Sequence, residues 1–209
     1  MNAAPIDDGL YLDIVRFAAH TGWLHAFLAL FTTFGVGIFA LLWLIGFLWA
    51  RGGDPLMRSA ALLTPVAVVL AYLISAGVKV GLREPRPCRA LHVVHTVLPC
   101  DPVGDFSFPS NHSVIVAAAT VCLFLISRTL GWLSLVLALL MGFSRVYVGA
   151  HYPHDVVAGF LLGAAVALLV ALARAPLARA LLRHDHRLLR LLVGPPTLTE
   201  HATANAEHG

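Results

Sequence analysis

A dozen residues in the second half of this chain hold the side chains best suited to chemistry. Ser144 and Arg145 are followed by five residues, then by His151, three more residues and Asp155. Apart from this arginine and this aspartate, residues 131–173 carry no formal charge. Ionisable groups at the edge of apolar segments are energetically expensive, so a functional role is the first hypothesis for them.

The histidine and the aspartate have the spacing of a catalytic pair. Pro153 fits the first turn of a helix, so we expect a helix to begin there and to run to Ala173. Asp155 then lies in the first turn, where its carboxylate can accept from one ring nitrogen of His151 and leave the other nitrogen free as base or nucleophile. Taken alone, the pair also fits two polar anchors at a membrane interface.

Two further clusters supply positive charge and polar groups. Six residues separate Lys79 from Arg86, and Ser110, Asn111 and His112 follow a proline. Ser110 is a suitable N-cap, so the helix after it would offer free backbone N–H groups to an anion. Together with Arg145, Lys79 and Arg86 would supply three positive charges, which match an oxyanion of about two negative charges.

Two histidines complete a site for phosphoryl transfer. His151, oriented by Asp155, would attack phosphorus and form a phosphohistidine, and His112 would protonate the departing oxygen. The cations and N–H groups would supply the charge stabilisation, so we expect neither a metal nor a cofactor. Individually, Lys79 and Arg86 also fit snorkelling anchors, and His112 fits a polar residue at a helix start.

Composition places this site in a membrane protein. The chain has 209 residues, 59% of them hydrophobic and 12% charged, and its mean hydropathy is +0.83. These values indicate a polytopic membrane protein, and the dispersed net charge of +3 argues against nucleic-acid binding. Asp7 and Asp8 precede the first apolar run without a basic region, so we expect no cleavable signal peptide.

The apolar runs predict an all-α membrane bundle. Residues 1–23 form an N-terminal interfacial segment, with an amphipathic helix at 9–23. Residues 24–176 form the embedded domain, and 177–209 form a basic amphipathic helix with a disordered tail from Gly194. Within the embedded domain, five crossings are expected at 26–50, with a possible break at Gly35, and at 60–78, 114–126, 132–143 and 156–173.

Five crossings place the two chain ends on opposite sides of the membrane. The arginines at 51, 58 and 128 and those of the C-terminal helix then share one face, which the positive-inside rule makes cytoplasmic. Loop 80–111 and the stretch around His151 meet on the outer face of the plasma membrane. Cys88 and Cys100 lie in that loop; spacing alone does not decide whether they pair.

The three clusters together resemble the signature of the type 2 phosphatidic acid phosphatase (PAP2) family, which shares its core with vanadium haloperoxidases. The resemblance covers roughly residues 35–173. It implies a helical bundle and the roles given above, with the phosphate held by a set of polar side chains: Lys79, Arg86, Ser110 and Arg145. The family usually has glycine where this chain has Asn111, whose amide adds a hydrogen-bond donor.

Several activities fit this pattern. The preferred one is a membrane lipid phosphatase acting on undecaprenyl diphosphate, because the chain is short and resembles the compact bacterial members of the family. Phosphatidic acid and phosphatidylglycerophosphate are alternative substrates. A vanadate-dependent haloperoxidase would lack the multiple spans, and a non-catalytic lipid-binding relative would usually have lost one of the two histidines, which are both present here at 112 and 151.

Overall fold

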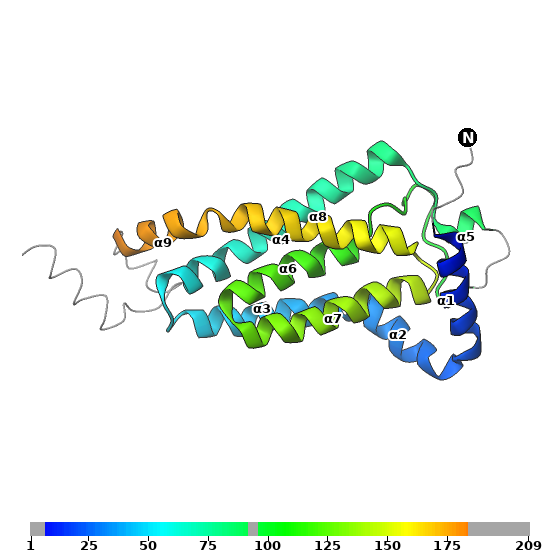
Figure 1. The fold of residues 1–209 in the computed structure, drawn as a ribbon, viewed down its shortest axis with the longest axis horizontal. Helices are drawn as coiled ribbons and strands as arrows, with labels where there is room; N and C mark the ends of the chain where they lie inside the picture. The colour runs from blue at the N-terminus through cyan, green and yellow to red at the C-terminus, as the bar shows by residue number, and fades with distance from the viewer. Residues whose placement is uncertain (1–6, 92–95, 184–209) are drawn as a thin grey trace, which may run out of the picture.

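The computed structural model describes residues 7–91 and 96–183. These residues form an all-helical bundle without a β-strand among them. Most of its helices run along one long axis (Figure 1). In chain order the helices are α1 (Asp8–His20), α2 (Gly22–Phe34), α3 (Val36–Ala50), α4 (Pro55–Leu82), α5 (Pro87–Ala90), α6 (Asn111–Ile126), α7 (Arg128–Tyr147), α8 (Pro153–Ala171) and α9 (Arg174–Arg183).

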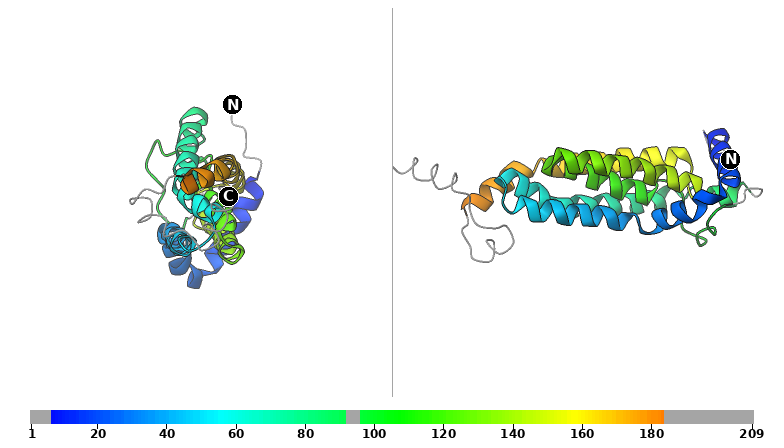
Figure 2. Two further views of the ribbon diagram at one scale, coloured as in Figure 1. Left: turned by 90° about the vertical axis from the view of Figure 1, so that its left-hand side faces the viewer. Right: turned by 90° about the horizontal axis from the view of Figure 1, so that it is seen from below.

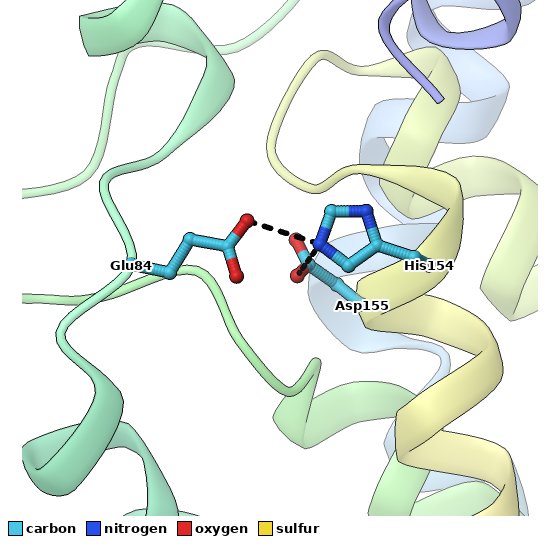
Figure 3. A group of neighbouring side chains, drawn as sticks. All are labelled: Glu84, His154 and Asp155. Carbon is cyan, nitrogen blue, oxygen red and sulfur yellow. Dashed lines mark hydrogen bonds and ion pairs between the residues drawn. The ribbon is translucent and has the colours of Figure 1, made fainter. Parts of the chain in front are cut away.

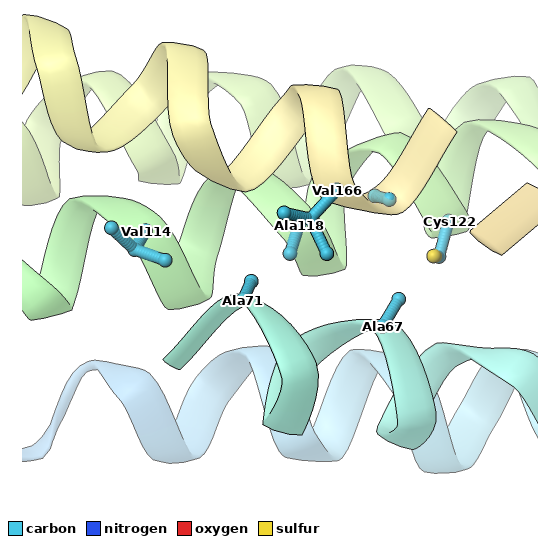
Figure 4. Close-up of a cluster of buried hydrophobic side chains, with 7 residues drawn as sticks. Ala67, Ala71, Val114, Ala118, Cys122 and Val166 are labelled. Carbon is cyan, nitrogen blue, oxygen red and sulfur yellow. The ribbon is translucent and has the colours of Figure 1, made fainter. Parts of the chain in front are cut away.

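Helix α6 is the centre of the bundle. It packs against α3, α4, α7 and α8. One of its apolar faces contributes Val114, Ala118 and Cys122 to a core that also contains Ala67 of α4 and Val166 of α8 (Figure 4). The small side chains in this core let the three helices approach closely. Cys122 is buried in this core as a free cysteine.

Two glycines set the distance between α6 and α8. A Cβ atom at Gly163 would lie 2.2 Å from the carbonyl oxygen of Val114, and one at Gly159 would lie 2.7 Å from that of Ser110. Both contacts are too short for any side chain, so α8 meets the backbone of α6 directly. The Ser110 contact lies at the start of α6, where the site begins.

The membrane bundle is confirmed, with differences in the crossings. By length and hydropathy, three helices in the described part of the chain can cross a membrane, namely 55–90, 128–147 and 153–181. Among the described residues, α3 and α6 are apolar but shorter, and the bent pair α1 and α2 would make a fourth crossing if counted as one span. The count of five is therefore approximate.

The expected crossing at 26–50 is interrupted. Helix α2 ends at Phe34, and α3 begins at Val36. Gly35 lies between them, and a Cβ atom there would lie 2.7 Å from the Met141 side chain. Hydropathy could not decide this break, because both pieces are apolar.

A helix lies near each end of the described chain. Helix α1 lies across one end of the bundle (Figure 2), as a separate N-terminal helix. The basic C-terminal helix begins at Arg174 and packs against α4, whereas the sequence placed its start after Pro176. Its last arginines and the tail from Gly194 lie outside the described residues.

We expect Gly163→Ala to destabilise the bundle, because the new methyl group would collide with α6. Overpacking of this kind costs about 1–3 kcal/mol. Thermal unfolding in detergent measures the effect. Gly77→Ala is the matched control, since a Cβ atom at Gly77 meets nothing within 4 Å. Equal unfolding temperatures for the two variants would contradict the close helix contact.

Candidate active site

The three clusters meet at one end of the bundle, the end that α1 covers (Figure 1). Lys79 lies near the end of α4, and Arg145 near the end of α7. Ser110 precedes α6, and His151 lies in the short connection between α7 and α8. Residues separated by up to 72 positions in the sequence therefore lie at the same end of the bundle.

His151 and Asp155 form a buried pair. Helix α8 begins at Pro153, as predicted, and Asp155 lies in its first turn. The Asp155 Oδ2 atom is 3.3 Å from His151 Nδ1 and accepts from the Tyr152 backbone N–H at 2.9 Å. The Ser107 hydroxyl donates a short hydrogen bond to the same oxygen. These contacts fix the carboxylate although it has no access to water.

The free nitrogen of His151 faces a cation. Arg86 Nη1 lies 3.4 Å from His151 Nε2. A guanidinium can only donate, so Nε2 is the acceptor and the ring proton lies on Nδ1, toward Asp155. Burial, followed by the nearby charges of Arg145 and other cations, holds the pKa of His151 well below its usual value. The imidazole is therefore neutral and has a lone pair on Nε2.

Two carboxylates from the loop before α6 form ion pairs with Arg86 and Lys79. Arg86 pairs with Asp101 at 2.6 Å and with Asp105 at 2.9 Å. Lys79 lies 3.8 Å from Asp105 and donates to the backbone carbonyl groups of Phe106 and Ser107. An incoming oxyanion would have to compete with both aspartates for these donors.

Arg145 is the third cation and the least neutralised. It is buried, with Nη1 donating to Thr32 Oγ1 of α2 at 3.0 Å, and its Nε has no hydrogen-bond partner. It also lines a cavity of about 330 Å³ together with residues 148–150, Cys88 and Cys100. An unpaired buried donor beside a cavity is suited to an anion.

The start of α6 contributes three polar residues. Ser110 occupies the N-cap position, as expected, but its hydroxyl makes no capping bond and is buried without a partner. Asn111 Oδ1 accepts from Ser75 of α4 at 2.6 Å, which holds the amide in place. His112 is half-buried, and the same three cations act electrostatically on it and on His151.

A disulfide joins Cys88 and Cys100, which lie close in sequence to Arg86 and Asp101. This settles the pairing that spacing left open. Arg86 and Asp101 flank the disulfide and form an ion pair with each other. The bridge therefore restrains both partners.

A second histidine lies on the far side of Asp155. Among the described residues, Glu84, His154 and Asp155 have ligand atoms that all lie within 4.8 Å of one another (Figure 3). This spacing is close enough to hold a metal ion. The His154 ring already pairs with Glu84 through Nε2 at 3.0 Å and with Asp7 through Nδ1 at 2.8 Å. We therefore assign this group to hydrogen bonding.

The family model described as the PAP2 superfamily matches residues 60–178, more than half of the chain. The chain belongs to the PAP2 superfamily. It is 30% identical over 150 residues to the undecaprenyl-diphosphatase BcrC of Bacillus subtilis, covering 72% of this chain and 75% of that protein. It is 34% identical over 113 residues to an undecaprenyl-diphosphatase of Sulfolobus acidocaldarius, covering 54% of each.

The fold also matches a solved PAP2 structure. The crystal structure of a transmembrane PAP2 type phosphatidylglycerolphosphate phosphatase from Bacillus subtilis superposes with a TM-score of 0.59 at 24% identity, covering 81% of this chain and 85% of that one. At this identity the likeness shows the shared fold alone. The family and its relatives identify this chain as a membrane lipid phosphatase, as the resemblance implied.

Several contacts of this PAP2 site were not predicted from the sequence. Asp101, Asp105 and Ser107 were not among the expected site residues, although Ser107 lies only three residues before Ser110. The nearness of Asp105 and Ser107 to the second cluster was the available signal. Nothing in the sequence pointed to Thr32, which reaches Arg145 from 113 residues away.

We expect Asp105→Asn to tighten inhibition by inorganic phosphate about fivefold, because the variant removes a carboxylate that competes for Lys79 and Arg86. Inhibition constants for phosphate measure the change. Asp13→Asn is the control, since this exposed aspartate pairs with Arg16 on α1. Weaker inhibition in the Asp105 variant would show that the carboxylate organises the cations and does not compete with phosphate.

Proposed function

We propose that this PAP2 protein hydrolyses undecaprenyl diphosphate to undecaprenyl phosphate and inorganic phosphate at the outer leaflet of the plasma membrane. The observation that carries the proposal is the neutral, buried His151, which is backed by Asp155 and faces Arg86 through its free nitrogen. The relatives named as undecaprenyl-diphosphatases support the choice of substrate.

His151 is the nucleophile in this mechanism. Its Nε2 lone pair attacks the terminal phosphorus, the bond to the bridging oxygen breaks, and a phosphohistidine forms. Positive charge develops on the ring, and Asp155 stabilises it through the Nδ1–H group. Ser107 and the Tyr152 N–H hold the carboxylate in position for this role.

His112 is the general acid. The negative charge of the bound diphosphate offsets the charges of Lys79, Arg86 and Arg145, so His112 takes up a proton when the substrate binds. It then gives this proton to the bridging oxygen, and undecaprenyl phosphate leaves as a stable product. The resulting neutral imidazole then takes a proton from water, which attacks the phosphohistidine and releases inorganic phosphate. His112 is protonated again and His151 returns to its starting state, so the cycle consumes one water molecule.

Lys79, Arg86 and Arg145 stabilise the negative charge of the transferring phosphoryl group. Arginine offers two parallel donors to phosphate oxygens, whereas lysine acts as a point charge. The backbone N–H groups at the start of α6 and the free Ser110 hydroxyl add neutral donors. This donor set performs the electrostatic work without a metal ion in the mechanism.

Other substrates use the same chemistry. A relative named phosphatidylglycerophosphatase B of Bacillus subtilis is 40% identical over 78 residues, and the superposed crystal structure is also of a phosphatidylglycerolphosphate phosphatase. Phosphatidylglycerophosphate is therefore the second candidate, ahead of phosphatidic acid. The first relative covers 72% of this chain and the phosphatidylglycerophosphatase only 32%, which favours the diphosphate.

The outer face is supported by the disulfide. Disulfides persist in oxidising compartments, and Cys88–Cys100 lies at the same end of the bundle as the candidate site. The arginines at 51 and 128 lie at the opposite end, where the positive-inside rule places the cytoplasm.

The first test is phosphate release by purified protein from undecaprenyl diphosphate, phosphatidylglycerophosphate and phosphatidic acid, with and without EDTA. We expect the highest kcat/KM with the diphosphate and no effect of EDTA. His151→Ala should lower kcat by about three orders of magnitude, and His112→Ala by about 10²-fold or more. His20→Ala on exposed α1 is the control.

The outcomes separate the claims. Preference for a glycerophospholipid would reject the substrate, and loss of activity in EDTA would reject the metal-independent mechanism. A radiolabelled phosphohistidine that persists in His151→Ala would reject the assignment of the nucleophile.

The second test is reduction of the disulfide. We expect dithiothreitol to lower kcat/KM about tenfold, because a small displacement of Arg86 misplaces the phosphate. The double variant Cys88→Ala/Cys100→Ala should show the lower activity without reductant and no further response to it. Full activity in the double variant would show that the loop holds Arg86 without the bridge.

A further inference from the structure

His154 occupies an unusual position next to the candidate catalytic pair. Its ring is stacked between Tyr152, at 5.3 Å between centroids, and Phe108, at 5.9 Å. The ring edge faces carboxylates on both sides, Asp7 at Nδ1 and Glu84 at Nε2. The ring is thus held by two aromatic faces and by two separate parts of the chain.

Both ring nitrogens of His154 must carry protons. Nδ1 lies 2.8 Å from Asp7 Oδ1, and Nε2 lies 3.0 Å from Glu84 Oε1. Ionised carboxylates only accept hydrogen bonds, whereas a neutral imidazole has one donor and one acceptor nitrogen. The two contacts are therefore satisfied together by the imidazolium, and stacking between aromatic rings favours a cation.

This cation faces the oxygen of Asp155 that the catalytic pair leaves free. Asp155 Oδ2 serves His151, Ser107 and Tyr152, whereas Oδ1 is buried without a hydrogen bond. His154 Nε2 lies 3.4 Å from Oδ1 (Figure 3). Asp155 is thus placed between two imidazoles, one on each oxygen.

We propose that His154 is a positioning residue whose imidazolium keeps Asp155 ionised and oriented toward His151. The inference rests on the proposed function, because it assigns the effect of His154 to the nucleophilic step at His151. A carboxylate without access to water is costly unless it is paired. The imidazolium provides that pairing from the side opposite the substrate.

The same cation connects the site to its surroundings. Asp7 immediately precedes α1, and its second oxygen accepts from the His154 backbone N–H at 2.7 Å. Glu84 lies between α4 and α5, and its backbone carbonyl accepts from the Ser107 N–H at 2.8 Å. Loss of the charge at residue 154 would therefore loosen contacts of Asp155 on both of its sides.

The direct test is nitrogen-15 NMR of histidine-labelled protein in detergent at neutral pH. We expect an imidazolium signal, with both nitrogens protonated, that is present in the wild type and missing from the spectrum of His154→Gln. A neutral tautomer at residue 154 would overturn the proposal. This readout does not depend on activity, so it stands apart from the identity of the substrate.

Kinetics with the best substrate of the panel test the effect on His151. His154→Gln removes the charge, and we expect kcat to fall about tenfold with KM changed less than about twofold. His154→Arg keeps a stacking cation and should recover most of kcat. The control is His20→Gln, because the His20 ring contacts the Arg16 carbonyl group on the exposed helix α1. Its kcat and KM should match those of the wild type.

A second variant guards against a folding defect at position 154. Asp7→Asn leaves His154 in place and weakens its charge, and we expect about a threefold lower kcat at unchanged KM. Equal kcat values for His154→Gln and His154→Arg would show that shape alone matters and would overturn the proposal. So would a loss that falls on KM, or wild-type kcat in both His154→Gln and Asp7→Asn.

Discussion

Burial of like charges is the constraint on which this site depends. Lys79, Arg86 and Arg145 are each at most 7% exposed, and their charges act together on His151. Three cations removed from water are stable only if anions or strong acceptors satisfy them. The contacts of Asp101 and Asp105, the carbonyl groups of the loop before α6, and Thr32 all follow from this requirement.

The bundle brings the anions and acceptors to the buried cations by placing several helix ends at the same position along its long axis. Helix α6 passes through the centre, and Gly159 and Gly163 let α8 contact its backbone. The Ser110 N–H then donates to the Asp155 carbonyl oxygen at 3.1 Å, which joins the starts of the two helices. The positions of His112 and His151 along the long axis of the bundle are therefore fixed by helix packing and not by the connecting loops alone.

The parts of the site that were predictable are those governed by local rules. Pro153 marks the start of α8, and the spacing of His151 and Asp155 follows from that start. Contacts between distant segments were not predictable, because neither periodicity nor composition encodes them: Thr32 on Arg145 and His154 on Glu84 are examples. The break at Gly35 was only suggested, because the residues on both sides of it are apolar and hydropathy does not distinguish one helix from two.

The anions around the cations differ in how easily they can leave. Asp155 has no exposed surface, and its Oδ2 atom accepts two hydrogen bonds besides its contact with His151, so its separation from the site would be costly. Asp101 and Asp105 are 38% and 44% exposed, so water can replace their contacts at small cost. In the proposed mechanism, an arriving phosphate group therefore displaces Asp101 and Asp105 and leaves Asp155 in place. The two exposed aspartates then stabilise the cations between turnovers, and the buried one keeps its contact with His151 throughout.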